Sequence, residues 1–166
     1  MDPWYFQGAA DILSNMTEGH LTLSNTRNIL AAEWEAGWQE VDESEGEVTF
    51  TWSRYLNRFF HVFAGANLEA VEGDTEETRG IFGFHYLLPL NLESRLWLDT
   101  DGGARASVEK SLELTPRISL SGEAQYDTHD YWEGSVTLAC LVGKNFSVLG
   151  RWHSAYGFGA GLQVRF

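Results

Sequence analysis

Three histidines, His61, His85 and His153, occupy the polar side of segments in which polar and apolar residues alternate. Imidazole nitrogens suit copper and zinc, so these side chains are candidate ligands for a soft metal. The other interpretation is that each histidine is hydrogen-bonded to a Glu or Arg neighbour. His85, for example, would approach Glu93 across a tight link at Pro89. The sequence favours the second interpretation and leaves copper binding open.

Two polar loops suggest other chemistry. In residues 126–131, Asp127 and His129 have the composition of an acid and histidine site, and such pairs can activate water in a hydrolase. No motif fixes a Ser nucleophile, and loops of this kind are usually solvated turns, so we do not expect an enzyme. Residues 99–103 resemble the start of a calcium loop but lack its downstream Glu, and they predict a hairpin instead.

Glutamates and arginines alternate with small or apolar residues over the second half of the chain. Buried charges persist in proteins when they are paired and hydrogen-bonded, so we expect these residues to form a network inside a narrow lumen, with Glu113 paired to Arg117. The predicted lumen charge network consists of Glu93, Arg95, Arg105, Glu109, Glu113, Arg117, Glu123, Arg151 and Arg165.

The elements that position these side chains are predicted to be β-strands. From about residue 27 onward, apolar residues recur at every second position, which is the period of a strand with one polar and one apolar face. In the last segment, Phe166, Val164 and Leu162 alternate with Arg165 and Gln163. The same pattern predicts ten strands, at 27–41, 47–52, 61–69, 79–86, 92–99, 105–114, 117–125, 133–140, 146–153 and 157–166.

Residues 1–26 are harder to interpret, because they fit either one more hairpin or an ordered tail. We prefer the hairpin, which gives twelve strands. No internal repeat or linker interrupts the sequence, so residues 1–166 are predicted to form one domain. The expected fold class is all-β, a single antiparallel up-and-down transmembrane β-barrel of about ten to twelve strands.

The connections and the aromatic residues favour a membrane barrel. Membrane barrels have short turns on one rim and longer loops on the other. The sequence shows such an alternation between tight links, near 56–58, 89–91, 115–116 and 143–145, and acidic or Gly-rich loops, at 42–46, 72–77, 99–103, 127–130 and 154–156. A soluble barrel of the lipocalin type would alternate too, but it would enclose its apolar face. Aromatic residues at the strand ends predict two girdles, with Tyr86, Phe146 and Phe166 at one rim and Trp38, Tyr126, Trp132, Trp152 and Phe158 at the other.

Composition excludes several classes of protein. The net charge of -13, with 11 Lys and Arg in total, argues against nucleic acid as a partner, and 43% hydrophobic residues argue against a disordered chain. Cys140 is the only cysteine, which excludes an internal disulfide. No run of about eighteen apolar residues predicts a membrane helix. Residues 1–3 lack the features of a signal peptide, so the sequence is interpreted as a mature form.

The stretch Trp52-Ser53-Arg54, the pairs Phe59-Phe60 and Ala64-Gly65, and Gly83-Phe84-His85-Tyr86-Leu87-Leu88-Pro89 are similar to segments of the copper resistance protein B family of outer-membrane barrels. The likeness continues through 92–94 and 102–109 to Leu114-Thr115-Pro116-Arg117-Ile118. It implies an outer-membrane protein of a Gram-negative bacterium that acts in copper tolerance. The Met- and His-rich segment that commonly precedes the barrel in that family has no counterpart here.

The sequence therefore predicts a barrel without enzymatic activity that acts in metal tolerance or narrow polar transport. The alternative is a structural or interaction barrel whose acidic loops bind divalent cations, and a hydrolase at the rim is third. The expected partners are membrane lipid and lipopolysaccharide. No bound cofactor is expected, apart from the copper that the family resemblance implies.

Overall fold

The computed structural model describes residues 2–39, 45–71, 74–129 and 131–166. Twelve strands and one short 3-10 helix make up the fold: β1 (Tyr5–Leu13), β2 (Met16–Ser24), β3 (Asn28–Gly37), β4 (Glu45–Asn57), β5 (Phe60–Val71), β6 (Asp74–Leu88), η1 (Pro89–Asn91), β7 (Leu92–Asp99), β8 (Ala104–Thr115), β9 (Ile118–Asp127), β10 (Tyr131–Leu141), β11 (Phe146–His153) and β12 (Gly157–Arg165). Over the described residues, no helix has the length and apolar character needed to cross a bilayer.

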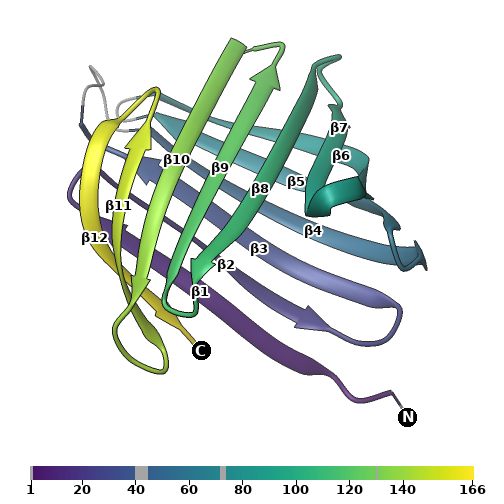
Figure 1. Cartoon of the computed structure of the whole chain (residues 1–166). Helices are drawn as coiled ribbons and strands as arrows, with labels where there is room; N and C mark the ends of the chain where they lie inside the picture. The colour runs from purple at the N-terminus through teal and green to yellow at the C-terminus, as the bar shows by residue number, and fades with distance from the viewer. Residues whose placement is uncertain (1, 40–44, 72–73, 130) are drawn as a thin grey trace.

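The strands close into an antiparallel up-and-down barrel in which each strand pairs with its neighbours in sequence (Figure 1). β1 and β12 complete the circle, with Ala9 opposite Arg165 and Leu13 opposite Gly161. Residues 5–24 therefore form the first hairpin, which confirms the preferred count of twelve strands. A closed sheet leaves no unpaired edge, and this is the requirement that a β-protein in a bilayer must meet.

The apolar faces of the strands point outward. On β4, Phe50 and Trp52 are 51% and 49% exposed, whereas Thr49 and Thr51, which alternate with them, are 5% and 8% exposed. The same alternation runs around the barrel and places Arg105, Asp127 and other polar side chains in the interior. The predicted orientation is confirmed, and the arrangement of a soluble barrel with an enclosed apolar face is excluded.

Both predicted groups of aromatic residues lie on the outer surface. At the rim where β1 begins and β12 ends, called the terminal rim, Tyr86, Phe146 and Phe166 are exposed. At the other end, called the opposite rim, Trp38, Tyr126, Trp132, Trp152 and Phe158 are exposed. Figure 1 shows both chain ends at the terminal rim. Side chains of this kind favour the boundary between water and the hydrocarbon of a bilayer.

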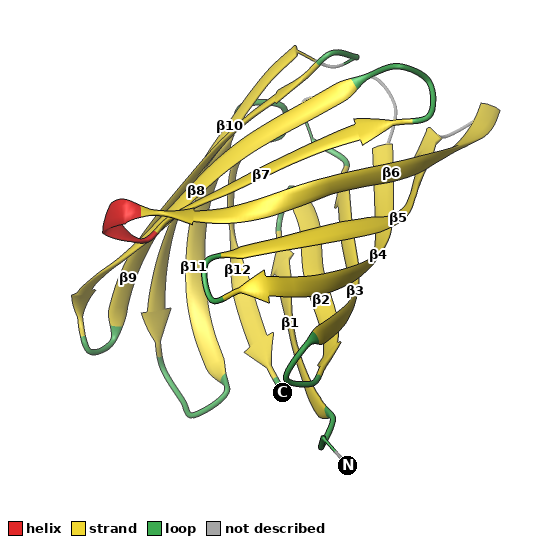
Figure 2. Cartoon of the chain, turned by 90° about the vertical axis from the view of Figure 1, so that its right-hand side faces the viewer, coloured by secondary structure: helices red, strands yellow, loops and turns green. Residues whose placement is uncertain are grey.

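The lengths of the links distinguish the two rims less than the sequence predicts. At the opposite rim, two residues separate β1 from β2 and three separate β11 from β12, while four separate β10 from β11 at the terminal rim. Strands β4 and β6 are instead the longest, with 13 and 15 residues, and with β5 between them they extend the wall on one side (Figure 2). Link length is therefore a weak guide to the orientation of the barrel.

A group of apolar side chains fills part of the interior. Leu13, Met16, Leu149 and Tyr156 are 0% to 7% exposed and pack together inside the wall. The side chain of Asn15, in the turn between β1 and β2, donates a hydrogen bond of 2.9 Å to the carbonyl oxygen of Tyr156. The first and last hairpins are thereby joined within the lumen, which narrows the space left for solvent.

Three inward-facing glycines lie where neighbouring strands approach too closely for a side chain. A Cβ atom on Gly65, Gly83 or Gly161 would overlap a backbone carbonyl oxygen of the adjacent strand. Glycines at such places allow a strand to bend around a barrel corner. Gly161 does so at the seam between β1 and β12, where its Cβ would meet the carbonyl of Ile12.

We therefore expect Gly161→Ala to weaken the closed barrel, because the added methyl group forces β1 and β12 apart. The expected loss in free energy of unfolding is about 1–3 kcal/mol, the cost of overpacking a close-packed site. Urea unfolding in lipid vesicles, followed by tryptophan fluorescence, measures the loss. Gly122→Ala is the matched control, because a Cβ there meets only the oxygen of Ser135 at 3.8 Å. Equal destabilisation by the two substitutions would contradict this account of the seam.

Candidate functional site in the lumen

The middle of the barrel holds a cavity of about 340 Å³. Side chains or backbone of β2, β3, β4, β6, β7, β8 and β9 line it. Its ionisable lining is strongly acidic, because seven glutamates and only two arginines contribute, together with two histidines. The glutamates are Glu18, Glu33, Glu35, Glu47, Glu93, Glu109 and Glu123. The arginines are Arg95 and Arg105.

Three of these glutamates form a row across β7, β8 and β9. Glu93 is registered opposite Glu109, and Glu109 is registered opposite Glu123. Within the described part of the chain, none of the three side chains forms a hydrogen bond or an ion pair. Like charges placed directly opposite one another destabilise a sheet. The row is tolerated because all three side chains are exposed to the cavity.

A second row of carboxylates crosses the facing wall. Asp11 is registered opposite Glu18 and Glu18 opposite Glu35, and the row continues through Glu47 to Glu69. Unlike the first row, this one has basic partners, because Arg151 contacts Asp11 and Glu18, Arg105 contacts Glu47, and Arg79 contacts Glu69. The lumen therefore has two acidic walls, one whose carboxylates contact arginines and one whose carboxylates do not.

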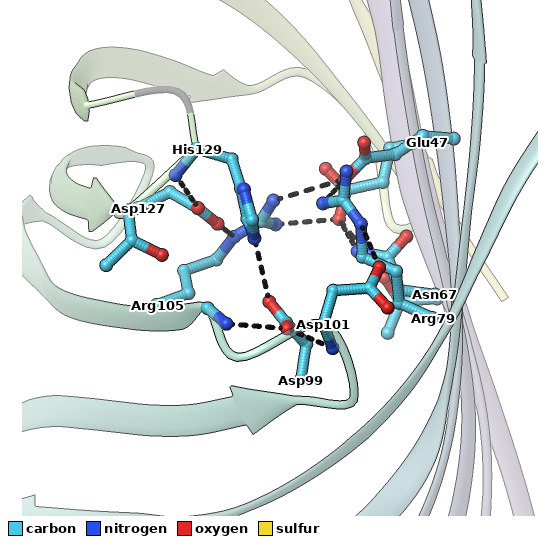
Figure 3. Close-up of polar contacts among 12 residues, drawn as sticks. Glu47, Asn67, Arg79, Asp99, Asp101, Arg105, Asp127 and His129 are labelled. Atoms are coloured by element: carbon cyan, nitrogen blue, oxygen red, sulfur yellow. Dashed lines mark hydrogen bonds and ion pairs between the residues drawn. The ribbon is translucent and has the colours of Figure 1, made fainter.

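Arg105 on β8 makes the most extensive of these contacts. Its Nε donates to Asp127 Oδ2 at 2.5 Å and its Nη1 donates to Glu47 Oε1 at 2.7 Å (Figure 3). The guanidinium group also lies 4.6 Å from the ring centroid of Trp97. Asn67 donates to the same Glu47 oxygen. A planar guanidinium has donors enough to join two carboxylates in this way. Arg105 therefore links β8 to β4 across the lumen.

Two other arginines also join strands that are not neighbours. Arg95 on β7 donates to Glu33 on β3 at 2.7 Å. Arg151 on β11 contacts Asp11 on β1 at 2.9 Å and Glu18 on β2 at 2.5 Å. Because these contacts skip one to three strands of the circle, the arginines connect parts of the wall that do not pair directly.

Near the opposite rim, further polar contacts hold the hairpin loops. Arg79 on β6 contacts Glu69 at 3.1 Å and Asp101 at 3.3 Å, and His129 Nε2 lies 3.2 Å from Asp99 Oδ2. Glu69 is on β5 and Arg79 on β6, Asp99 ends β7, and Asp101 and His129 lie in the loops after β7 and β9. Arg79, Asp99, Asp101 and His129 lie near Arg105 in Figure 3. The loop at 100–103 is thereby connected to both sides of the lumen entrance.

The structure separates the nine members of the predicted charge network into two groups. Six of its members lie in the lumen, namely Glu93, Arg95, Arg105, Glu109, Glu123 and Arg151. Glu113, Arg117 and Arg165 lie at the terminal rim and do not line the cavity. The predicted pair of Glu113 with Arg117 was wrong, since Glu113 is registered opposite Ser119. Arg165 instead donates to Gln163 on its own strand at 2.7 Å.

The three histidines do not form one site. His61 and His85 are registered opposite each other, and their rings stack at 4.4 Å. His153 lies at the opposite rim, where its ring stacks on Tyr156 and its Nε2 is 3.6 Å from Glu35. Across the described ranges, no three His, Cys, Asp or Glu side chains are arranged to hold a metal ion. The expected contact of His85 with Glu93 was also wrong, because His85 is registered opposite Arg95.

The two loops that suggested other chemistry are built as hairpins. Asp127 accepts hydrogen bonds from the backbone amide of His129 and from Arg105, so it is not the partner of the His129 ring. Asp99 accepts from the backbone amides of Asp101 and Gly103, as in an Asx turn. The hairpin predicted for residues 99–103 is confirmed, and Asp127 and the His129 ring do not form the acid and histidine pair that was the less favoured interpretation.

Sequence reasoning missed the acidic partners on β1 to β4. Glu33, Glu35 and Glu47 lie in the segments predicted as strands at 27–41 and 47–52, but the predicted network does not include them. The register between neighbouring strands is the signal that could have identified them. A hairpin between 27–41 and 47–52 aligns Glu35 with Glu47, which reveals the second acidic row. Trp97, which lies beneath two guanidinium groups, was missed for the same reason.

No family model matches the sequence, and none of the curated proteins matches it significantly. The barrel is similar to a solved structure described as KdgM porin in complex with disordered oligogalacturonate, with a TM-score of 0.62 and 15% identity over 97% of this chain and 98% of that chain. A second KdgM porin structure gives a TM-score of 0.57 and 14% identity, with the same coverage. The resemblance to the copper resistance protein B family stays a prediction. At these identities the structural likeness concerns the fold, which is that of a transmembrane β-barrel.

Proposed function

We propose that the chain forms a narrow passage across the outer membrane that prefers cations to anions. One observation carries the proposal, namely the cavity of about 340 Å³ lined by seven glutamates and two arginines. Rings of acidic side chains select for cations in channels, because they attract ions of opposite charge and repel those of the same charge. A lumen with low-dielectric walls strengthens this effect by focusing the field.

The row of Glu93, Glu109 and Glu123 supports a role beyond filling the barrel. If the lumen had only a structural role, the barrel would be more stable with these carboxylates paired to basic residues or replaced by neutral ones, because like charges in register weaken the sheet. The retained row exposes three carboxylates to the cavity. Positions where a sequence departs from the most stable choice are candidates for function.

The negative charge of the cavity lining argues against acidic sugars as transported solutes. Oligogalacturonate, which is present in one of the KdgM porin structures, is an oligomer of uronic acid units and carries a carboxylate on each unit. A chain of carboxylates would meet repulsion from the seven glutamates of this cavity. Small cations and neutral polar solutes fit the electrostatics better.

The passage is narrow because side chains occupy part of the lumen. The apolar group around Leu13, Met16 and Leu149 fills one side, and the bridge from Arg105 to Glu47 crosses the other. Wide conduction of the general porin type is therefore not expected. The apolar outer belt with aromatic residues at both rims supports placement in a membrane, and the closed barrel fold supports the outer membrane in particular.

Replacing Glu93, Glu109 and Glu123 together by Gln should lower cation preference. We expect the ratio of potassium to chloride permeability to fall several-fold, since three unpaired carboxylates leave the lumen. Reversal potentials in planar bilayers under a potassium chloride gradient measure this ratio. The wild-type preference should also weaken as salt concentration rises, because ions screen the carboxylates.

A matched pair on β8 tests whether position matters. Glu109→Gln and Glu113→Gln change the net charge equally, but only Glu109 lines the cavity. We expect the first substitution to reduce selectivity and the second to leave it unchanged. If wild-type protein gives no conductance, or if the two variants behave alike, the proposed passage is wrong and the barrel is a structural one.

Substitution of Arg105 should widen the passage. Arg105→Gln removes the bridge between β8 and β4, so we expect larger single-channel conductance and stronger cation preference. It also leaves Glu47 and Asp127 without their basic partner, which should lower the free energy of unfolding by about 3 kcal/mol. Single-channel recording and urea unfolding measure the two effects.

Arg165→Gln is the control for charge, because Arg165 is exposed at the terminal rim. Arg105→Lys keeps the lumen charge but cannot join two carboxylates with a planar fork. We expect it to raise conductance with little change in selectivity. Unaltered conductance in both Arg105 variants would show that the bridge does not limit the passage.

A further inference from the structure

Basic residues are distributed unevenly over the barrel. Four of the 11 Lys and Arg residues, Arg79, Arg95, Arg105 and Arg151, contact carboxylates inside it. The other seven lie in the half of the barrel that carries the terminal rim. They are Arg27, Arg54, Arg58, Lys110, Arg117, Lys144 and Arg165. In a chain of net charge -13, this end is therefore the basic one.

Three of these residues line one hollow on neighbouring hairpins. Arg27 lies between β2 and β3, Arg54 is near the end of β4, and Arg58 lies between β4 and β5. The hollow is completed by Thr26, Tyr55, Leu56 and Asn57. All three arginines are exposed, and none forms an ion pair with a carboxylate of the described residues. A group of unpaired guanidinium groups is a ready receptor for an anion.

The surroundings of the hollow point to a lipid anion. Arg54 continues the outward face of Phe50 and Trp52 on β4, so it emerges beside the acyl-chain surface. Leu56, which lines the hollow, and Phe59, which follows Arg58, are 60% and 44% exposed. The Arg58 guanidinium lies 4.4 Å from the ring centroid of Phe59. Mixed Arg and aromatic surfaces of this kind sit at the level of lipid head groups. A soluble anion would not need apolar side chains beside its site.

We propose that the hollow of Arg27, Arg54 and Arg58 binds the phosphate of an anionic phospholipid head group at the terminal rim. Guanidinium groups bind phosphate oxygens through paired, charge-assisted hydrogen bonds, and three arginines attract a lipid of net negative charge over a zwitterionic one. The apolar residues beside the hollow contact the acyl chains of the same lipid. This site is independent of the lumen, so it does not rest on the proposed conduction.

The test compares protein in nanodiscs of phosphatidylcholine alone with protein in nanodiscs that also contain phosphatidylglycerol. We expect the anionic lipid to raise the melting temperature of the wild-type barrel, as any ligand of the folded state does. The variant Arg27→Gln, Arg54→Gln, Arg58→Gln should lose that rise. Native mass spectrometry should show fewer phosphatidylglycerol molecules retained on this variant.

The control variant Arg117→Gln, Lys144→Gln, Arg165→Gln removes three basic residues from the same rim, outside the hollow. It should keep the rise in melting temperature. Equal loss in both variants, or retention of the rise when the hollow is neutralised, would overturn the proposal. So would an equal rise on adding inorganic phosphate to phosphatidylcholine nanodiscs, since that would make the ligand a soluble anion. If the triple variant does not fold, Arg54→Gln alone should reduce the rise.

Discussion

The seam between the first and last strands is the constraint on which the rest of the barrel depends. Ala9 to Leu13 pair with Gly161 to Arg165, and Gly8 and Phe166 exchange two backbone hydrogen bonds beyond them. Once the circle is closed, every strand has one face inside and one outside, and no backbone edge meets lipid. Closure also forces charged side chains from different strands to face each other across a small space. The acidic rows and their arginine contacts follow from this geometry.

Much of this fold could be predicted from alternation alone. Strands such as β4 and β12 carry large apolar residues at every second position, so their period and their outward face are unambiguous. The first hairpin was harder to recognise because its outward positions include Gly8, Ala10 and Gly19, which contribute little hydrophobic contrast. Orientation also followed from the residues, because Glu and Arg cannot face acyl chains without partners.

The contacts across the lumen could not be predicted in the same way. Alternation shows that Arg105 and Glu47 both point inward, but their meeting depends on the curvature of the sheet and on the stagger between strands β4 and β8. Local reasoning therefore paired Glu113 with Arg117, which are close in sequence and lie at the rim. The register between adjacent strands is harder to predict than the alternation but easier than the contacts across the lumen. It follows from the hairpin links, and it would have revealed both rows of glutamates.

Because Arg105 and Arg151 neutralise carboxylates and also join separated strands, the diameter of the lumen and its net charge are coupled properties. A substitution that removes one of these arginines makes the interior more acidic, and it also removes a contact that holds separated strands together. Conversely, a barrel that evolves toward a wider bore loses positive charge as it does so. In a barrel with these cross-lumen contacts, the loss of one arginine therefore changes both properties at once, toward a lumen that is wider and more acidic.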